Sequence, residues 1–513
     1  MTRKRTPAAR LTLPRTSLAV ALLLVTGPVA AHDDHTALHD HTGDTSEGLG
    51  KAHFDNSCSL QVSADIDKGV NLLHSFWYDE ARNTFIAVEK QEPDCAIAYW
   101  GHAMGYYQQV EQLPVGDELT QGKKAIAAAQ AAQHKTPRES AYINALALIY
   151  DDKAAPKSTA RANLYENAMG RLSAKYPDDR EAQVFHALAL LSPELPDDPK
   201  LTRARKALTI LNKVLKAEPD NPGVIHYIIH ASDHPGLAPL GLDAARRYAQ
   251  IAPASAHALH MPGHIFARLG LWDEDIQSNL ASKAAAEGHS ALHIGAENRL
   301  HAMEFLEYAY IQKGMHEQAA AIAKEAATVK PEELNPGFSG YYGWVQAAIP
   351  ARLALETHDW EGALALKPDA QHNPNSSLVT AWAHAVAAGH LQDAKQGAEA
   401  EALYRSVLTP EQVSSQEKNL ESTWVETHAW ALFAQGQTDR AIALMRPLAD
   451  HQDKVGKREV EIPAREMLGD MLLLTHHIRE AFNEYKRSLQ TDPGRYNSLL
   501  HASETAGALK LHP

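Results

Sequence analysis

The stretch AREMLGDMLLLTHHIREAFNEYKRSLQTDP, residues 464–493, decides the fold. Its apolar residues recur at helical spacing, and a proline ends it, so it predicts a pair of amphipathic helices. Small and large residues occupy set places within the pair: Gly469, Leu472, Ala481, Tyr485 and Pro493.

The same unit recurs along the chain. An early copy has Gly69, Leu72, Ala81, Phe85 and Pro93, and degenerate copies close at Pro177, Pro219 and Pro331. This pattern resembles the tetratricopeptide (TPR) repeat, whose 34-residue unit prefers a small residue, a large one, Ala, an aromatic and Pro at these places. No alternation of period two is sustained, so we expect no strands. The resemblance implies an all-α fold, an α-solenoid over residues 57–513 with a concave inner wall.

The start of the chain is typical of a secretory signal. Basic residues precede an apolar run from Leu18 to Val25, and the small residues Val29, Ala30 and Ala31 offer a cleavage site. We expect residues 1–31 to be removed and the protein to be periplasmic or secreted. Residues 32–56 are rich in His and Asp without apolar periodicity, which predicts a flexible tail.

Several segments also resemble exported bacterial TPR proteins: NLLHSFWY (71–78), CAIAYWG (95–101), HYIIH (226–230), HMPGH (260–264) and AREMLGD (464–470). This resemblance implies fold and export, and it implies no particular reaction.

The charge of the chain bears on its partners. The net charge is −14, and removing the five basic residues of the first 31 positions, where there is no acid, leaves −19. So acidic a surface repels phosphate backbones, and we expect no nucleic-acid partner. No other apolar run reaches the ~18 residues of a membrane span, so no transmembrane segment is expected in the mature chain. Phosphate-binding glycine loops, Cys-x-x-Cys and Gly-x-Ser-x-Gly motifs are absent.

Cys58 and Cys95 are the two cysteines of the sequence. In an oxidising compartment an isolated pair is most simply a disulfide. Closing a loop of that length with a disulfide would stabilise the fold by on the order of 3 to 4 kcal/mol in the chain-entropy model.

The chain has 29 histidines, and nine of them fall between His226 and His301. Counted from Pro219 and Pro253 as position 32, successive first helices carry His at position 5 and again at position 9, and the second also carries one at position 2. The next unit has His301 at position 2 and Glu304 at position 5. Positions 2, 5 and 9 line the concave groove in the TPR family. The resemblance therefore implies that these histidines converge: His226, His230, His257, His260, His264 and His301.

Imidazoles with nearby carboxylates favour a transition metal ion such as Zn, Cu or Fe over Ca or Mg, and the sequence does not distinguish among the three. A cation would also relieve the repulsion among groups that titrate near pH 6.5. Glu304 is a candidate general base. Glu297, one turn before His301, is a second candidate or a partner that orients the ring. Pro262 favours a helix start there, which makes His257 the weakest of the six ligands.

The other histidines carry weaker predictions. His234 and the pair His289/His293 are minor metal candidates, and the tract HDDHTALHDH (32–41) has the composition of a metal collector or of a merely solubilising tail. The remaining repeat-position histidines, at position 7, are expected to pack against the neighbouring helix: His102, His186 and His428.

Three functions fit these patterns. The first is a metal site on the concave wall that performs hydrolytic or oxygen chemistry. The second is a metal chaperone or sensor without turnover. The third is a scaffold that holds a peptide, a protein or a small molecule in the groove without metal, with the histidines as polar, pH-sensitive contacts.

Overall fold

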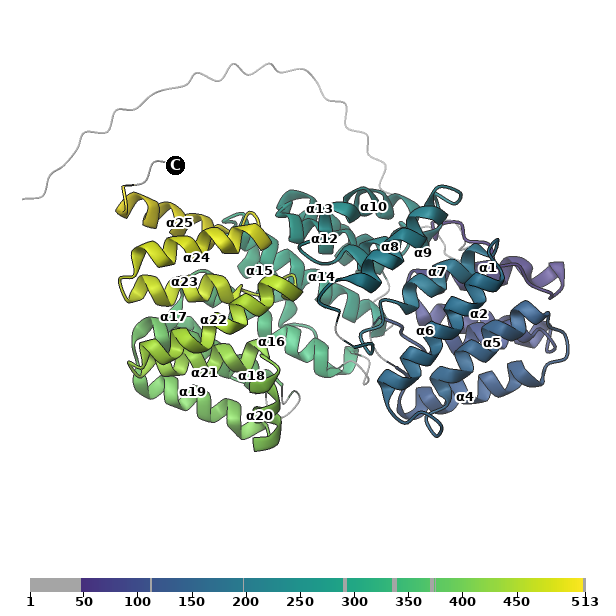
Figure 1. The fold of residues 1–513 in the computed structure, drawn as a ribbon, viewed down its shortest axis with the longest axis horizontal. Helices are drawn as coiled ribbons and strands as arrows, with labels where there is room; N and C mark the ends of the chain where they lie inside the picture. Colours follow the sequence, from purple (N-terminus) through teal and green to yellow (C-terminus); the bar gives the residue numbers. More distant parts are fainter. Residues whose placement is uncertain are drawn as a thin grey trace, which may run out of the picture. The chain divides into compact units, whose positions relative to one another are not determined.

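Helices pair along the chain because each has one apolar face that only a neighbouring helix can bury. Figure 1 shows the arrangement in a computed structural model, which describes residues 48–510 apart from 111–112, 197, 289–292, 335–338, 370–372 and 374. The signal predicted at 1–31 and the tract 32–41 lie outside the described residues. The described residues belong to one compact unit.

The first half of the described chain holds the following helices: α1 (Leu60–His74), α2 (Tyr78–Gln91), α3 (Ala96–Met104), α4 (Gly116–Ala131), α5 (Pro137–Tyr150), α6 (Ser158–Lys175), α7 (Arg180–Ala189), α8 (Thr202–Leu215), α9 (Pro222–Ser232), α10 (Ala238–Ile251), α11 (Ala256–His260) and α12 (Pro262–Leu269).

The second half continues with these helices: α13 (Trp272–Glu287), α14 (His293–Gln312), α15 (His316–Ala326), the 3-10 turn η1 (Pro331–Glu333), α16 (Ser339–Glu356), α17 (Trp360–Ala365), α18 (Ser376–Leu391), α19 (Ala394–Val407), α20 (Pro410–Lys418), α21 (Ser422–Ala434), α22 (Thr438–Val455), α23 (Ala464–Leu474), α24 (Ile478–Thr491) and α25 (Tyr496–Ala508).

Helix stacking confirms the predicted fold class. Consecutive helices pack as hairpins, such as α1 with α2 and α23 with α24, and each hairpin packs on the next. Among the described residues the only β pairing is an isolated bridge between Cys95 and His134. The chain is an all-α, TPR-like helical repeat.

The small and large repeat positions fit together sterically. A Cβ added to Gly69 or to Gly101 would collide with the ring of Phe85, and one added to Gly469 would collide with Tyr485. The glycines therefore let an aromatic ring from the second helix of a unit sit directly against the backbone of the first helices. This contact explains why the pattern quoted above specifies helix pairs.

The expectation of a flexible tail through residue 56 is wrong for its described part, residues 48–56. Leu49 and Phe54 are buried, and the Phe54 ring packs 5.2 Å from that of Trp100 and 5.0 Å from that of Tyr142, measured between centroids. The segment has few apolar residues, but these few are buried against the apolar surface of the helices. Sequence periodicity cannot detect such docking.

The disulfide prediction agrees with the structure. Cys58 and Cys95 are bonded, with their Cα atoms 5.3 Å apart. The bond joins the segment before α1 to the start of α3.

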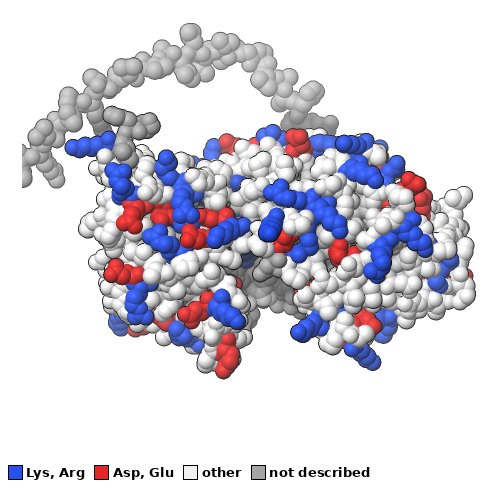
Figure 2. Space-filling model, viewed as in Figure 1, with Lys and Arg blue, Asp and Glu red and all other residues white. Residues whose placement is uncertain are grey.

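The surface carries charges of both signs. On the face drawn in Figure 2, Lys and Arg side chains are interspersed with Asp and Glu. Among the described residues, no helix combines the length and apolar character that a membrane crossing requires.

Candidate metal centre

Four helices bring the six predicted histidines together. His226 and His230 come from α9, His257 and His260 from the short α11, His264 from α12, and His301 from α14. Two of these helices, α9 and α11, begin with a side-chain cap: Asn221 accepts from the Val224 N–H and Ser255 from the Ala258 N–H.

Pro262 begins α12 as expected, but it does not displace any ligand. Met261 joins the two short helices in helical conformation, so His260 and His264 stay one turn apart on the same face. His257, which the sequence marked as the weakest candidate, lies within the cluster.

The first group of ligands is His226, His230 and His257, whose candidate donor atoms all lie within 4.8 Å of one another. The Nε2 atom of His226 is 3.0 Å from that of His230 and 3.1 Å from that of His257. We call this group the first triad.

The second group is His260, His264 and His301, which meets the same 4.8 Å criterion. The Nε2 atoms of His260 and His264 are 3.0 Å apart, and the ring centroids of His260 and His301 are 4.3 Å apart. We call this group the second triad.

These spacings suit ligands of a common ion. Nitrogens bound at about 2.0–2.1 Å to a tetrahedral ion lie about 3.3 Å from one another. The Nε2 pairs at 3.0 and 3.1 Å are therefore close to the separation that two imidazoles on one ion would have.

The outer nitrogens of three rings are held by hydrogen-bond acceptors. His226 Nδ1 lies 2.6 Å from the carbonyl oxygen of His74, and His260 Nδ1 lies 2.6 Å from Asn279 Oδ1. His264 Nδ1 lies 2.9 Å from Asp233 Oδ2. Because these oxygens only accept, each ring carries a proton on Nδ1 and directs its Nε2 into the triad. In the neutral rings of His226 and His260, that Nε2 presents a lone pair.

The residues that hold the outer nitrogens of these rings were not predicted from the sequence. The amide of Asn279 is oriented by Asp275, since its Nδ2 donates to the carboxylate of Asp275 at 2.7 Å. Neither Asn279 nor Asp275 lies in a sequence motif that indicates this role. Asp233 lies three residues after His230, a spacing that could have marked it as a neighbour of the cluster.

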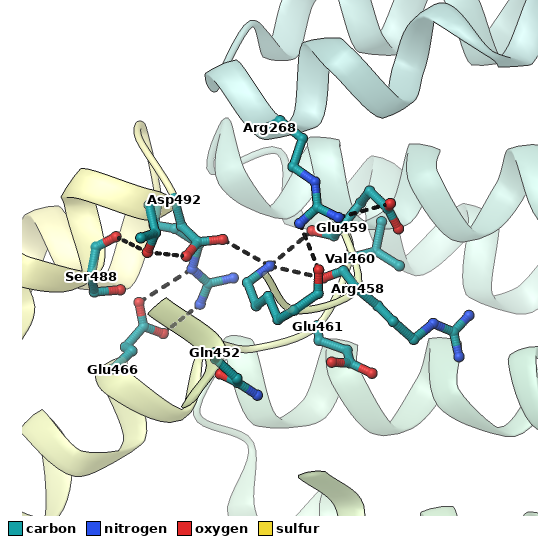
Figure 3. A network of polar contacts seen from close by, with 12 residues as sticks. Arg268, Gln452, Arg458, Glu459, Val460, Glu461, Glu466, Ser488 and Asp492 are labelled. Carbon is teal, nitrogen blue, oxygen red and sulfur yellow. Dashed lines mark hydrogen bonds and ion pairs between the residues drawn. The ribbon is translucent and has the colours of Figure 1, made fainter. Parts of the chain in front are cut away.

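A charged segment between α22 and α23 carries Arg458, Glu459 and Glu461, as Figure 3 shows. Through Glu459 this segment also reaches His264. Arg268 of α12 donates to Asp233 at 2.9 Å and to Glu459 at 3.0 Å, and Glu459 also lies 3.4 Å from His264 Nδ1. Asp233, His264 and Glu459 could by distance hold an ion of their own. Because Arg268 donates to both carboxylates, they serve better as outer partners of His264.

Burial keeps most of the cluster neutral. Desolvation, reinforced by neighbouring histidines, lowers the pKa well below the ordinary value of 6.5 for four of the rings: His226, His230, His257 and His260. Burial also disfavours charge on His264, but Asp233 and Glu459 raise its pKa to about 10. Neutral imidazoles are the form that binds metal.

A cavity of about 530 Å³ opens beside both triads. His230 and His257 of the first triad and His264 and His301 of the second line it, whereas His226 and His260 lie behind them, 0% and 2% exposed. The other lining residues are Phe76, Tyr78, Asp79, Arg82, Gln108, Val110, Glu118, Met261, Glu297, Asn298, Glu304, Phe305, Tyr341, Tyr342, Arg458, Glu459 and Val460.

The two predicted general bases both line this cavity. Glu304 is fully buried, with Oε2 3.3 Å from His301 Nδ1, and its pKa is lowered because the contact with His301 and the charges of Arg458 and Arg352 outweigh burial. That contact suits a residue that orients His301. Glu297 is also buried. Their role as bases stays a prediction.

Among the described side chains, His234 and the three position-7 histidines belong to neither triad. His234 Nδ1 accepts a hydrogen bond from the Gly236 N–H, and the side chains of His289 and His293 lie outside those described. The three position-7 histidines each contact a glutamate of a neighbouring helix, in the pairs His102–Glu89, His186–Glu166 and His428–Glu401. This agrees with a packing role.

Comparison with known proteins adds nothing about the site. No protein family and no curated protein matches the chain. The human IFIT1 dimer with m7Gppp-AAAA is 11% identical, with a TM-score of 0.32, and the match covers 77% of this chain and 90% of that one. The TPR domain of P58(IPK) is 11% identical, with a TM-score of 0.21, over 88% of this chain and 98% of that one. Similarity at this level carries no argument about function.

Proposed function

We propose that this chain is an exported TPR-type protein that binds a transition metal through the histidine cluster on its inner wall. The observation that carries the proposal is the orientation of the rings: Nδ1 of His226, His260 and His264 is held by an oxygen on the outside, while Nε2 is directed at another Nε2. Nε2 atoms held 3.0–3.1 Å apart in this way are placed to bind one cation between them.

The set of donors favours Zn, Cu or Fe. All six are imidazole nitrogens, which suit these ions and do not suit Ca or Mg. A bound ion of this kind supplies Lewis acidity or, for Cu and Fe, redox chemistry.

The cavity favours a reactive site over pure storage. Three protein ligands leave a coordination position open, and catalytic zinc sites keep such a position for water or substrate. Four of the six histidines border the cavity, so this position would face a space of about 530 Å³, large enough for a small molecule. Glu297 or Glu304 would then move the proton, and the aromatic rings of the lining would contact the substrate.

Elemental analysis of protein purified without a histidine tag tests the proposal. We expect stoichiometric Zn, Cu or Fe, and we expect the His260→Ala protein to contain less metal than wild type. His186→Ala is the matched control, because His186 contacts Glu166 far from the triads. Absence of metal from folded wild-type protein, even after incubation with ZnCl₂ or CuSO₄, would refute metal binding.

A metal-free scaffold is the second candidate, and one observation favours it. Leu499 and Leu500 of the last helix, α25, are 51% and 39% exposed, so this helix presents apolar side chains that a partner could cover. A chaperone or sensor is less favoured, because the cavity beside the triads has room for a small-molecule substrate.

A further inference from the structure

The two triads are copies of one arrangement, related by the repeat. His226 and His260 are 34 residues apart, as are His230 and His264. In each triad, two of the candidate ligands lie one helical turn apart on the same repeat. The third lies at the start of the next repeat, and it is His257 in the first triad and His301 in the second. His257 and His301 are 44 residues apart, so this step is longer than one repeat unit of 34 residues. The repeat therefore builds the same three-histidine site twice.

The distances favour two sites over one six-ligand site. An octahedral ion with bonds of about 2.1 Å would hold all six nitrogens within about 4.2 Å of one another. The donors meet a 4.8 Å limit only within each triad, and the six do not merge into one group. Between triads the ring centroids of His230 and His264 are 6.5 Å apart, and those of His257 and His260 are 6.4 Å apart.

The charge of the cavity also suits more than one cation. Its lining includes the carboxylates of Asp79, Glu118, Glu297, Glu304 and Glu459 and the guanidinium groups of Arg82 and Arg458. Two further guanidinium groups pair with this lining, Arg268 with Glu459 and Arg352 with Glu304, so the carboxylates outnumber the guanidinium groups by one. Two divalent ions at neighbouring sites repel each other, and an excess of nearby carboxylates lowers that cost.

We propose that the protein binds two transition metal ions side by side, one in each triad, on a single wall of the cavity. The inference rests on the proposed function and adds to it the number and placement of the ions. Adjacent packed helices lie about 8–10 Å apart, so ions held by successive repeats lie within that range or closer. One small molecule in the cavity could then contact both ions, as substrates do in two-metal sites.

Metal counting on tag-free, full-length protein dialysed against ZnCl₂ tests the number of ions. Because residues 32–41 could bind Zn²⁺ themselves, the informative quantity is the loss relative to wild type. We expect His230→Ala to lose one ion, His301→Ala to lose one, and the double variant to lose two, while His186→Ala loses none. Circular dichroism checks that each variant is folded.

Two results would overturn the inference while leaving the proposed function in place. One is a wild-type protein whose single ion is lost in either variant, with no further loss in the double variant. The other is a pair of bound ions whose electron spins show no coupling when Cu²⁺ is the probe. The proposed function fails differently, through the absence of any ion that depends on the triads.

Electron paramagnetic resonance with Cu²⁺ as the probe tests the placement. We expect an isolated Cu²⁺ spectrum at one equivalent bound to the triads. At two equivalents the spectrum should broaden or lose intensity because neighbouring spins couple. His230→Ala should abolish the broadening while keeping one signal. Two full, unbroadened signals in wild type would contradict side-by-side ions.

Discussion

The central helices α9–α14 and the C-terminal helices α23–α25 belong to the same solenoid but bury polar groups in opposite ways. In the C-terminal region Arg495 is fully buried, with Nη1 2.5 Å from Glu356 Oε1 and Nε 3.2 Å from Glu466 Oε2. Figure 3 shows Glu466 within this network, beside the segment that carries Arg458 and Glu459. In the central region the buried groups are imidazoles that face one another.

The two regions differ in where the partners of their buried polar groups come from. Glu356 and Glu466 share the guanidinium of Arg495, and Asn497 and Ser498 donate further hydrogen bonds to them. The chain itself therefore supplies the partners of both carboxylates. The triads bring imidazole nitrogens within 3.0–3.1 Å of one another, and under the proposed function a bound cation supplies their common partner. The following predictions test this contrast, beginning with the largest effect.

Removing the charge at the centre of the C-terminal network should cost most. Arg495→Ala leaves Glu356 and Glu466 buried without their partner, and it should lower the free energy of unfolding by about 3–5 kcal/mol. Denaturant unfolding with and without Zn²⁺ measures the loss, which should be equal in both. Lys395→Ala, which removes an exposed pair with Glu399, is the control and should cost about 0.3–0.5 kcal/mol. Equal losses in the two variants would contradict the contrast.

Metal should stabilise the central region through mass action. Zn²⁺ at 100 times its dissociation constant should raise the free energy of unfolding by about 2.7 kcal/mol for each site. Thermal melts followed by circular dichroism measure this. Arg495→Ala should retain the increase, whereas the double variant His230→Ala/His301→Ala should lose it. An increase that survives in the double variant would assign the Zn²⁺ to another part of the chain.

Asn279 tests the outer shell of the second triad. Asn279→Ala removes the acceptor that holds His260 Nδ1, and loss of such a partner typically weakens metal binding 10–100-fold, or about 1.4–2.8 kcal/mol. Zn²⁺ titration calorimetry should show one weakened site and one unchanged site. Asn163→Ala, which removes an exposed amide bonded only within α6, should leave both sites unchanged.

A smaller effect, on the stability of the metal-free protein, is expected as the pH falls below 6.5. The folded pKa of His226, His230, His257 and His260 lies well below 6.5 because of burial. Above 6.5 these rings are neutral in both states. As the pH falls below it, the unfolded chain binds protons that the folded chain excludes, so the metal-free protein loses stability.

His264 acts in the opposite direction. Its folded pKa of about 10 means that its contribution is fully present below 6.5 and is lost as the pH rises to 10. Melting temperatures of metal-free protein across this range should therefore pass through a maximum near neutral pH. Substitution of Ala for His226 and His260 should flatten the acid side, and an unchanged acid limb would contradict the burial argument.

The ligands could be found in the sequence because they obey the repeat register. His226, His230, His260 and His264 recur at the spacing set by Pro219 and Pro253, and the same period that packs Gly469 against Tyr485 also aligns their rings. Their outer partners could not be found in this way. Asn279 meets His260 across 19 residues, and Glu459 meets His264 across nearly 200 residues.

The sequence by itself determined the helix pairs, the disulfide partners and the residue type of the candidate ligands, because these depend on local periodicity and on chemistry. Only the tertiary structure decided that six histidines divide into two triads, that residues 48–56 pack against the body, and that the segment after α22 reaches His264. Contacts between distant segments depend on how helices stack in three dimensions. Local spacing does not encode that arrangement.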